Sequence, residues 1–479
     1  MNALSDAKTP LHVLASDPAT EIFLVDARFK RLNKAVGEMR TLVAPGIYKL
    51  RFRSAQTQID QLIEVPPDGA PLITAPLVPF VTAMPLDDTA YADPKHQQIV
   101  RETTASPAQR VLGSGSRFCL FARDPLDQEI ERGWSGLSVH RLDGTPIADI
   151  DDVHPSQSAS MAALSLELDP GTYRVRVSPA NAPVHEIFVP LSRGWQTQLF
   201  TLSEVPSPSH LPRRPSLRDA SISMAALGTA FEPADPSLRL AELLRYGLES
   251  GRSVLTDAAL ARVLNDPVTN LLLHIFVGHL LIRERSDAQS AVSKIVERAK
   301  NLVGDLPDVA ALLLRPGIGT PPKALRFDKP PLLRSSWNLI VAATRRRMSL
   351  VPPDSLTAKV GEGLVTHPFW LMNGLVDSPP EKTRKLMSFA EATRLLTHLI
   401  RTQPDQLDAK RRYAIDQIMA EASPLERSLL NTTLLQPDPF EANAKVRRAY
   451  SVSKALKQIQ APNYSIARSV QRLKDKLEL

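Results

Sequence analysis

The stretch APGIYKLRFR at residues 44–53 recurs as DPGTYRVRV at residues 169–177, and this repeat decides the fold of the N-terminal half. In both stretches a Pro-Gly turn leads into a run that alternates apolar and basic side chains. An alternation of period two places one face of a β-strand on a core and the other face in water. We therefore predict that each stretch is a half-buried strand in one copy of a duplicated β-module.

The repeat extends in both directions from the Pro-Gly strand. HVLASDP at residues 12–18 matches CLFARDP at residues 119–125, and both end in Asp-Pro, which starts turns. LIEVP at residues 62–66 matches EIFVP at residues 186–190. The offset between matching segments grows along the chain, so the second copy carries longer loops.

Two further strands complete each copy. Residues 22–25 match residues 137–140, and the strand-like residues 195–202 follow the second copy as residues 72–81 follow the first. Short strands at this spacing, separated by turn residues, are typical of small antiparallel β-sandwiches. The predicted fold class is therefore multidomain, β then α, and it begins with two tandem sandwiches.

Composition divides the whole chain into five parts. Its 479 residues are too many for one core. Residues 205–236 are rich in Pro, Ser and Arg and cannot bury enough apolar surface to fold alone. The predicted organisation is β-module 1 at 9–85, a connector with a short helix near 95–101 at 86–115, β-module 2 at 116–204, a linker at 205–236, and a helical domain at 237–479.

After residue 236 the apolar period changes from two to 3.6, and no strand pattern of comparable strength follows. The helices have no fixed repeat length, so we predict a solenoid-like, all-α domain without tetratricopeptide periodicity. The predicted helices are 237–249 with Ser237 as the cap, 267–283 with Asp266 as the cap, 287–304, 331–347, two that begin with capping boxes at Ser388 and Ser423, and the last two near 441–460 and 463–477.

The Pro-Gly-x-Tyr strand with its basic side chains resembles the small β-sandwich modules of the PEGA and carboxypeptidase-regulatory-like class. The helical half resembles bacterial proteins through DPVTNLLLHIFVGHLL at 266–281, LPDVAAL at 306–312 and PPLLRSSW at 330–337. Proteins of that kind accompany caspase-like or trypsin-like proteases in bacterial conflict systems, including antiviral defence. The resemblance implies a role as a protein partner and supplies no functional residues.

Cys119 is the only cysteine, which excludes an intramolecular disulfide and a cysteine-based zinc site. Cys119 lies in an apolar strand, where a small buried residue is favoured over a nucleophile. We see no signal peptide, and the apolar stretch at 271–282 is shorter than the about 20 residues that a bilayer requires. We therefore expect a cytoplasmic protein that does not enter a membrane.

The sequence predicts no enzyme, no cofactor and no metal site. It contains neither the Gly-x-Ser-x-Gly of a serine hydrolase nor a phosphate-binding loop. His274 and His279 are five residues apart, about 140° around a helix, so we expect packed core histidines. The acidic residues of one loop favour solvation over calcium binding, and an unfamiliar site assembled across domains remains an alternative. The loop contains Asp143, Asp149, Asp151 and Asp152.

The net charge of +7 is concentrated at the C-terminus. Residues 381–479 contain 18 Lys and Arg against 11 Asp and Glu, and residues 1–380 contain 40 of each. A solvated helical surface is the favoured interpretation, with nucleic-acid binding and stacking by Tyr450 and Tyr464 as the alternative. The candidate basic patch consists of Lys445, Arg447, Arg448, Lys454, Lys457, Arg468, Arg472, Lys474 and Lys476.

The linker offers a candidate cleavage site at Arg213, Arg214 and Arg218, because an exposed, Pro-rich, basic segment suits a protease with arginine specificity. Pro215 hinders cleavage after Arg214, so Arg218 is the better candidate, and a simple basic spacer is the other interpretation. The predicted function is a non-enzymatic scaffold or adaptor for protein–protein interaction. Its partner could be a caspase-like or trypsin-like protease, and the alternative is a nucleic-acid-binding or sensing protein that uses the basic C-terminal helices.

Overall fold

The chain divides into two compact units in the computed structural model. Unit 1 comprises Met1–Ala182 and Ile187–Gly319, and unit 2 comprises Pro183–Glu186 and Thr320–Leu479. The structure describes residues 8–69, 72–125, 134, 136–150, 160–178, 184–204, 214–284, 288–304, 306–318, 321–344, 346–365 and 367–375.

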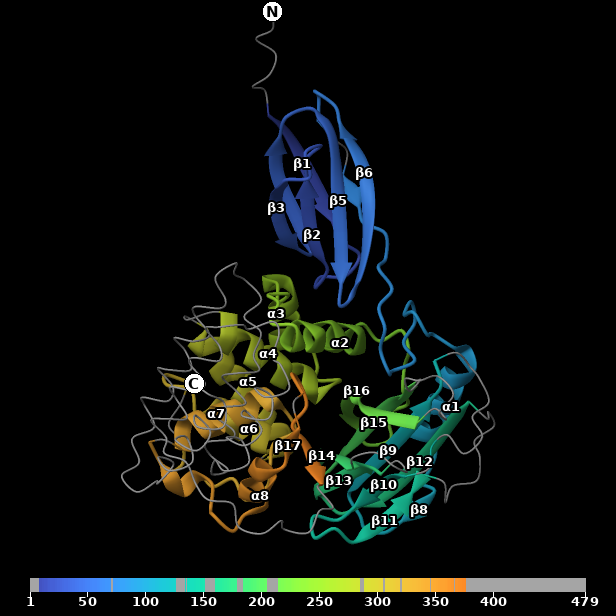
Figure 1. Cartoon of the computed structure of the whole chain (residues 1–479), viewed down its shortest axis with the longest axis vertical. Helices are drawn as coiled ribbons and strands as arrows, with labels where there is room; N and C mark the ends of the chain where they lie inside the picture. The colour runs from blue at the N-terminus through green and yellow to red at the C-terminus, as the bar shows by residue number, and fades with distance from the viewer. Residues whose placement is uncertain are drawn as a thin grey trace, which may run out of the picture. The chain divides into compact units, whose positions relative to one another are not determined.

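Module 1, drawn in blue in Figure 1, is a seven-stranded sheet. Its strand order is β6-β5-β2-β3-β4-β1-β7. Strands β3 and β4 pair only between Val36 and Glu38, across Gly37 with its φ of +73°. Alternate side chains of β5 are buried in an apolar core that includes Tyr48, Leu50 and Phe52. The strands are β1 (Thr9–Leu14), β2 (Glu21–Val25), β3 (Arg31–Val36), β4 (Glu38–Val43), β5 (Gly46–Ser54), β6 (Thr57–Val65) and β7 (Ile73–Thr74).

Module 2 repeats this pairing strand by strand. β9 pairs antiparallel with β12 as β1 does with β4, and β10 pairs with β11 and β13 as β2 does with β3 and β5. β15 runs parallel to β9 as β7 does to β1, and β14 lies beside β13. The strands are β9 (Ser116–Arg123), β10 (Leu137–His140), β11 (Pro146–Asp149), β12 (Met161–Leu168), β13 (Gly171–Val177), β14 (Val184–Leu191) and β15 (Trp195–Glu204).

The shared Pro-Gly-x-Tyr motif has the same physical role in both modules. The Tyr48 hydroxyl donates to the Ala44 carbonyl at 2.7 Å, and the Tyr173 hydroxyl donates to the Asp169 carbonyl at 2.9 Å. Each tyrosine thus reaches back four residues and closes the turn before its own strand, as a tyrosine corner does in other β-proteins. The segments matched by the repeat form strands with corresponding partners in the two modules.

The segment between the modules is packed rather than exposed. The expected short helix is confirmed as α1 (Pro94–Ala105), capped by Asp93, and β8 (Arg110–Val111) joins β12. Ala83, Met84 and Leu86 share one buried cluster with side chains of module 2. Within unit 1 the connector is therefore a structural part of module 2.

The linker expected at 205–236 is wrong for its second part. Residues 214–226 form β16 (Arg214–Ala226), which pairs antiparallel with β15. Residues 217–220 lie opposite the single residue Thr201, so β16 contains a wide irregularity. Pro215 is near the start of this outermost strand, a position where proline is tolerated. The pairing that stabilises β16 is not visible in its own composition.

Helices follow β16, as predicted, but several boundaries differ from our expectation. α2 (Pro236–Glu249) is capped by Asp235 and not by Ser237. Asp266 ends α3 (Asp257–Asn265), and α4 (Leu271–Glu284) begins four residues later than expected. Asn270 Oδ1 accepts the Leu272 amide at 3.2 Å at that helix start. α5 (Gln289–Val303) ends at Gly304, as predicted, and α6 (Pro307–Leu312) follows.

Unit 2 contains helices and, against expectation, short strands. Its helices are α7 (Arg334–Thr344), the 3₁₀ turn η2 (Met348–Leu350) and α8 (Leu356–Glu362). β17 (Leu364–Val365) pairs with β18 (Met372–Leu375), although the sequence predicted no strand after residue 236. The helices predicted after residue 376 lie outside the described residues. Among the described helices, none is long and apolar enough to span a bilayer.

Candidate functional site

Ion pairs join module 1 to helix α2 within unit 1. Asp17, in the Asp-Pro turn after β1, accepts from Arg239 Nε and Nη2 at 2.8 Å each. The Arg239 guanidinium also lies 5.0 Å from the centroid of the Phe80 ring. Both charged side chains are mostly buried, and bidentate geometry makes such a pair directional as well as attractive.

A second charged cluster surrounds Glu21, at the start of β2. Its carboxylate accepts from Arg53 at 2.7 Å and pairs with Lys34 at 2.9 Å and Arg252 at 3.4 Å. Burial alone would raise the pKa of Glu21, but hydrogen bonds from Arg53 and Lys34 outweigh it and lower that pKa. Arg252 also donates to the Ala55 carbonyl. Among the described residues, these charged groups attach module 1 at the end that carries Asp17 and Glu21.

A fully buried polar network lies beside this attachment. Glu242 Oε2 accepts from Thr82 Oγ1 at 2.6 Å, from Ser221 Oγ at 2.7 Å and from Arg245 Nη2 at 3.1 Å. Burial opposes the charge on Arg245, but the negative field of Glu242 outweighs it and raises the arginine pKa. The Tyr246 hydroxyl donates to the Val81 carbonyl at 2.6 Å. The network holds the segment at Val81 and Thr82 and the strand at Ser221 against helix α2, which is a structural role.

The opposite end of module 1 exposes large apolar side chains. Strand register fixes this distal end: Glu21 pairs with Arg53 beside α2, whereas Val25 pairs with Lys49 at the other end of the same two strands. The turns 26–30 and 44–46 therefore lie at the distal end. The exposed fractions there are 81% for Phe29, 74% for Leu62, 65% for Ile47 and 61% for Leu42.

Phe29 occupies a backbone position that suits glycine. In module 1 the Asp26 amide donates to Lys30 O and the Phe29 amide to Asp26 O, each at 3.0 Å. In module 2 the Arg141 and Gly144 amides make the same two bonds, to Thr145 O and Arg141 O. Gly144 has φ +93°, and Phe29 has φ +60°. A bulky side chain at such a φ costs about 1–2 kcal/mol.

The basic side chains of β5 are neutralised within module 1. Arg51 forms a bidentate pair with Asp60, at 2.7 and 3.0 Å, and Lys49 contacts the same carboxylate at 2.6 Å. The hydrogen bond from Arg51 holds the pKa of Asp60 well below its usual range. Arg53 is paired with Glu21. The alternating basic stripe is therefore a poor surface for anions.

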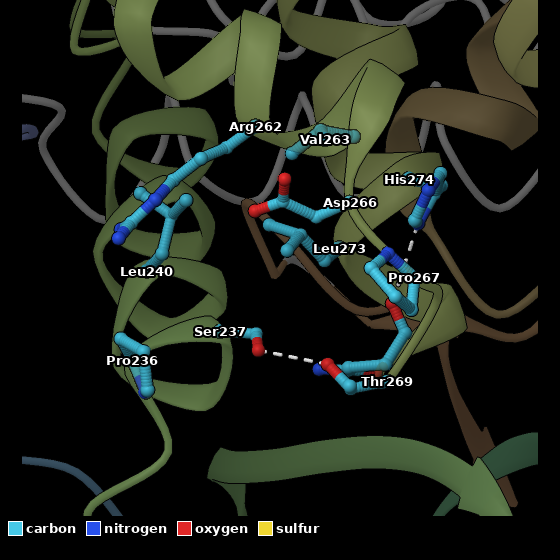
Figure 2. Close-up of a pocket in the computed structure, with 11 residues that line it drawn as sticks. Pro236, Ser237, Leu240, Arg262, Val263, Asp266, Pro267, Thr269, Leu273 and His274 are labelled. Atoms are coloured by element: carbon cyan, nitrogen blue, oxygen red, sulfur yellow. Dashed lines mark hydrogen bonds between the residues drawn. The ribbon is translucent and has the colours of Figure 1, made fainter.

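A small cavity lies between α2, α3 and the start of α4 (Figure 2). Its volume is about 90 Å³, and ligand pockets are typically about 300–1,000 Å³. Ser237 Oγ and Thr269 Oγ1 are 2.8 Å apart on one side, and His274 lies on another (Figure 2). Burial lowers the pKa of His274, so the ring is neutral near pH 7. We assign no ligand to this cavity.

Two further cavities among the described helices are open to solvent. One of about 280 Å³ is lined by His274 and Arg298, and one of about 300 Å³ by Gln289 and Arg315. Arg298 donates to the Val263 and Leu264 carbonyls at 3.1 and 2.9 Å. It therefore caps the C-terminal end of α3, where a cation is favoured.

The cysteine and the two histidines that the sequence offered as possible catalytic or metal-binding residues are buried side chains. Cys119 is fully buried in β9, and burial raises the pKa of its thiol to about 11. His274 and His279 are both buried in α4, and burial lowers the pKa of His279 to about 3. Asp143 accepts the Thr145 amide in a turn. Asp151 and Asp152 lie outside the described residues, and no metal-binding cluster occurs within the described ranges.

Two of the three predicted cleavage residues lie in a strand and not on a free linker. Arg214 and Arg218 belong to β16, and Arg218 is exposed in its irregular part, where its amide donates to Ser216 Oγ. Cleavage at Arg218 therefore requires part of β16 to leave β15, and it stays a prediction. Arg213 and the whole candidate basic patch, from Lys445 to Lys476, lie outside the described residues.

Sequence reasoning missed the features that single out module 1. Phe29 follows a predicted strand and stands between Arg28 and Lys30 in a turn, and a lone aromatic among basic turn residues was the available signal. The pair of Asp17 and Arg239 carried no such signal, because its members are 222 residues apart.

No protein-family model matches the chain, and no curated protein matches it. Among solved structures, it is similar to the Bacillus anthracis TIE protein, with 11% sequence identity over 39% of this chain and 32% of that chain. The match thus spans about a third of that structure. Its TM-score of 0.17 carries no argument about fold or function.

Proposed function

We propose that this chain is a non-enzymatic adaptor that binds a protein partner through the distal end of module 1. The two modules are small β-sandwiches of the PEGA-like type, and the helical part is a solenoid-like support. Module 2 and helices α2–α6 form the body of unit 1, and module 1 is attached to helix α2 of that body. The observation that carries the proposal is Phe29, exposed at a position where module 2 has glycine.

The physical argument is that Phe29 costs free energy at this turn position without a gain in burial. Phe29 gains little burial and holds an unfavourable backbone conformation, although glycine serves the same turn in module 2. Strain that stability does not require is a recurring feature of functional positions. Aromatic and arginine side chains also contribute most to protein–protein binding energy, and Arg28 precedes Phe29.

The partner is a protein with an apolar pocket for an aromatic ring. Leu42, Ile47 and Leu62 surround the distal end with further exposed apolar surface. Scattered single residues of this kind are ordinary, but several on one end of a small module indicate an interaction site. The resemblance to proteins that accompany caspase-like or trypsin-like proteases makes such a protease the first candidate.

The test is co-purification of the tagged full chain from its native host after mild chemical cross-linking. We expect one or a few specific proteins with the wild-type chain and about a tenfold lower yield with Phe29→Gly, because an interface anchor contributes about 2 kcal/mol or more. Met348→Ala is the matched control, since Met348 is equally exposed but lies in unit 2. Its yield should equal that of the wild type.

Two outcomes contradict the proposal. One is that no protein is enriched over the tag alone, and the other is that both substitutions lower the yield equally. Urea unfolding of each variant shows that a lost partner does not reflect a lost fold.

A further inference from the structure

The two modules differ at one matching sheet edge. In module 1, β6 is the outermost strand of its sheet within the described part of the chain. In module 2, the equivalent strand is β14, whose first residues are grouped with unit 2. There β18 is the next strand beside β14. Within unit 2 the chain thus adds a strand of its own beside the first residues of β14, whereas β6 has no such neighbour among the described residues.

Side chains at aligned positions of β6 and β14 also differ in exposure. The Val-Pro ends of the two strands align Leu62 of β6 with Glu186 of β14. Leu62 is largely exposed, whereas Glu186 is fully buried and accepts from Asn373 Nδ2 of β18 at 2.9 Å. A position that one copy covers with an added strand is therefore open to solvent in the other.

We propose that the β6 edge accepts an extended segment of another protein as an eighth strand, by β-augmentation. This inference rests on the proposed function and names its binding mode. β6 is nine residues long and contains neither proline nor lysine, two of the features that commonly protect exposed edges. Main-chain hydrogen bonds supply affinity in this mode, and alternate side chains supply specificity.

The charges of β6 define the chemistry of the added strand. Its only charged residues are Asp60 and Glu64, both acidic, and Asp60 is already paired with Lys49 and Arg51. Ile63 and Val65 of β6 face the core, whereas Leu62 and Glu64 face outward. A strand added beside β6 should therefore alternate apolar side chains on the core side with outward Lys or Arg opposite Glu64, and the outward residue opposite Leu62 should be apolar. A second copy of this chain fits less well, because antiparallel pairing of two β6 strands about Leu62 would place Glu64 opposite Asp60.

The experiment selects peptides against the immobilised full chain from a phage library of random dodecapeptides. We expect enriched peptides in which apolar residues alternate with Lys or Arg at a period of two. The best peptide, made synthetically, should bind Leu62→Lys about tenfold more weakly than the wild type, since that variant loses an apolar contact and adds like charge. Val111→Lys is the control, because Val111 is similarly exposed but lies on β8, away from module 1.

Hydrogen–deuterium exchange supplies the second readout. A peptide bound to the edge should slow exchange in residues 57–65 and leave residues 38–43 unchanged. The inference is overturned if no peptide is enriched, if the peptides show no alternation, if both lysine variants bind equally, or if protection appears elsewhere. A partner that still co-purifies with Leu62→Lys would refute the β6 edge and leave the adaptor function intact.

Discussion

The equivalent strands of module 1 and module 2 pair alike, except that a bridge joins β3 to β4 while β11 and β12 lie in separate sheets, yet equivalent positions make different contacts. The Asp-Pro aspartate binds Arg239 of α2 in module 1 and Ser203 of β15 in module 2. The residue before it is Ser16 in one and Arg123 in the other. One copy is built into the body, and the other is attached to it at one end and exposes the other end.

The comparison shows that the two copies share the contacts that support strand pairing, whereas residues at the sheet edge differ. Tyr48 and Tyr173 retain the same hydrogen bond, because that bond closes the turn on which the next strand depends. Leu62 and Glu186 differ, because among the described residues β14 has a neighbouring strand on its edge and β6 does not.

The largest effect is expected at Arg123. This buried side chain donates to the Ala83 and Tyr91 carbonyls at 2.8 and 2.7 Å and to Thr82 O at 3.0 Å, and burial lowers its pKa to about 10. Arg123→Met leaves buried carbonyls without donors and should cost about 3–5 kcal/mol of unfolding free energy. Urea denaturation measures it.

The control is Ser16→Ala at the equivalent position of module 1. Ser16 makes one hydrogen bond, to the Ala75 carbonyl, so a loss of about 1 kcal/mol is expected. Equal losses at both positions would show that Arg123 does not organise the connector.

The next effect concerns the attachment of module 1. A double-mutant cycle of Asp17→Asn and Arg239→Gln should give a coupling energy of about 1–3 kcal/mol, because the pair is bidentate and mostly buried. A cycle of Asp124→Asn and Ser203→Ala, in module 2, should give a smaller coupling of about 1 kcal/mol, since one partner is neutral. A larger value in module 2 would reverse the comparison.

Substituting the turn residue should change the stability of the protein in opposite directions in the two modules. Phe29→Gly should stabilise the protein by about 1 kcal/mol, because glycine adopts a positive φ without strain. Gly144→Ala should destabilise it by about the same amount. Thermal unfolding of both variants checks the signs, and destabilisation by Phe29→Gly would remove the argument from strain.

The equivalent strands of the two modules were largely predictable from sequence, because the motifs that identify them are local. The Pro-Gly-x-Tyr, Asp-Pro and Val-Pro segments identified equivalent strands, since turns and period-two alternation depend on neighbouring residues. β16 was not predictable, because its Ser-rich strand is stabilised by β15 and by buried partners of Ser221 and Ser223. β17 and β18 are two and four residues long and exist only through non-local pairing.

The smallest effect is expected at the tyrosine corners. Tyr48→Phe and Tyr173→Phe each remove one hydroxyl bond to a carbonyl and should each cost about 1 kcal/mol. Matching losses in chemical denaturation would show that the corner does the same job in both copies. A loss confined to one module would mean that the motif is maintained for another reason in the other.

The most direct test of the open edge compares backbone exchange in β6 and β14 of the full chain without any partner. Hydrogen–deuterium exchange with mass spectrometry should find faster exchange in residues 57–65 than in residues 184–191, because amides that face an unpaired edge are unprotected. Equal protection of the two strands would contradict the claim that module 1 keeps open the edge that module 2 covers.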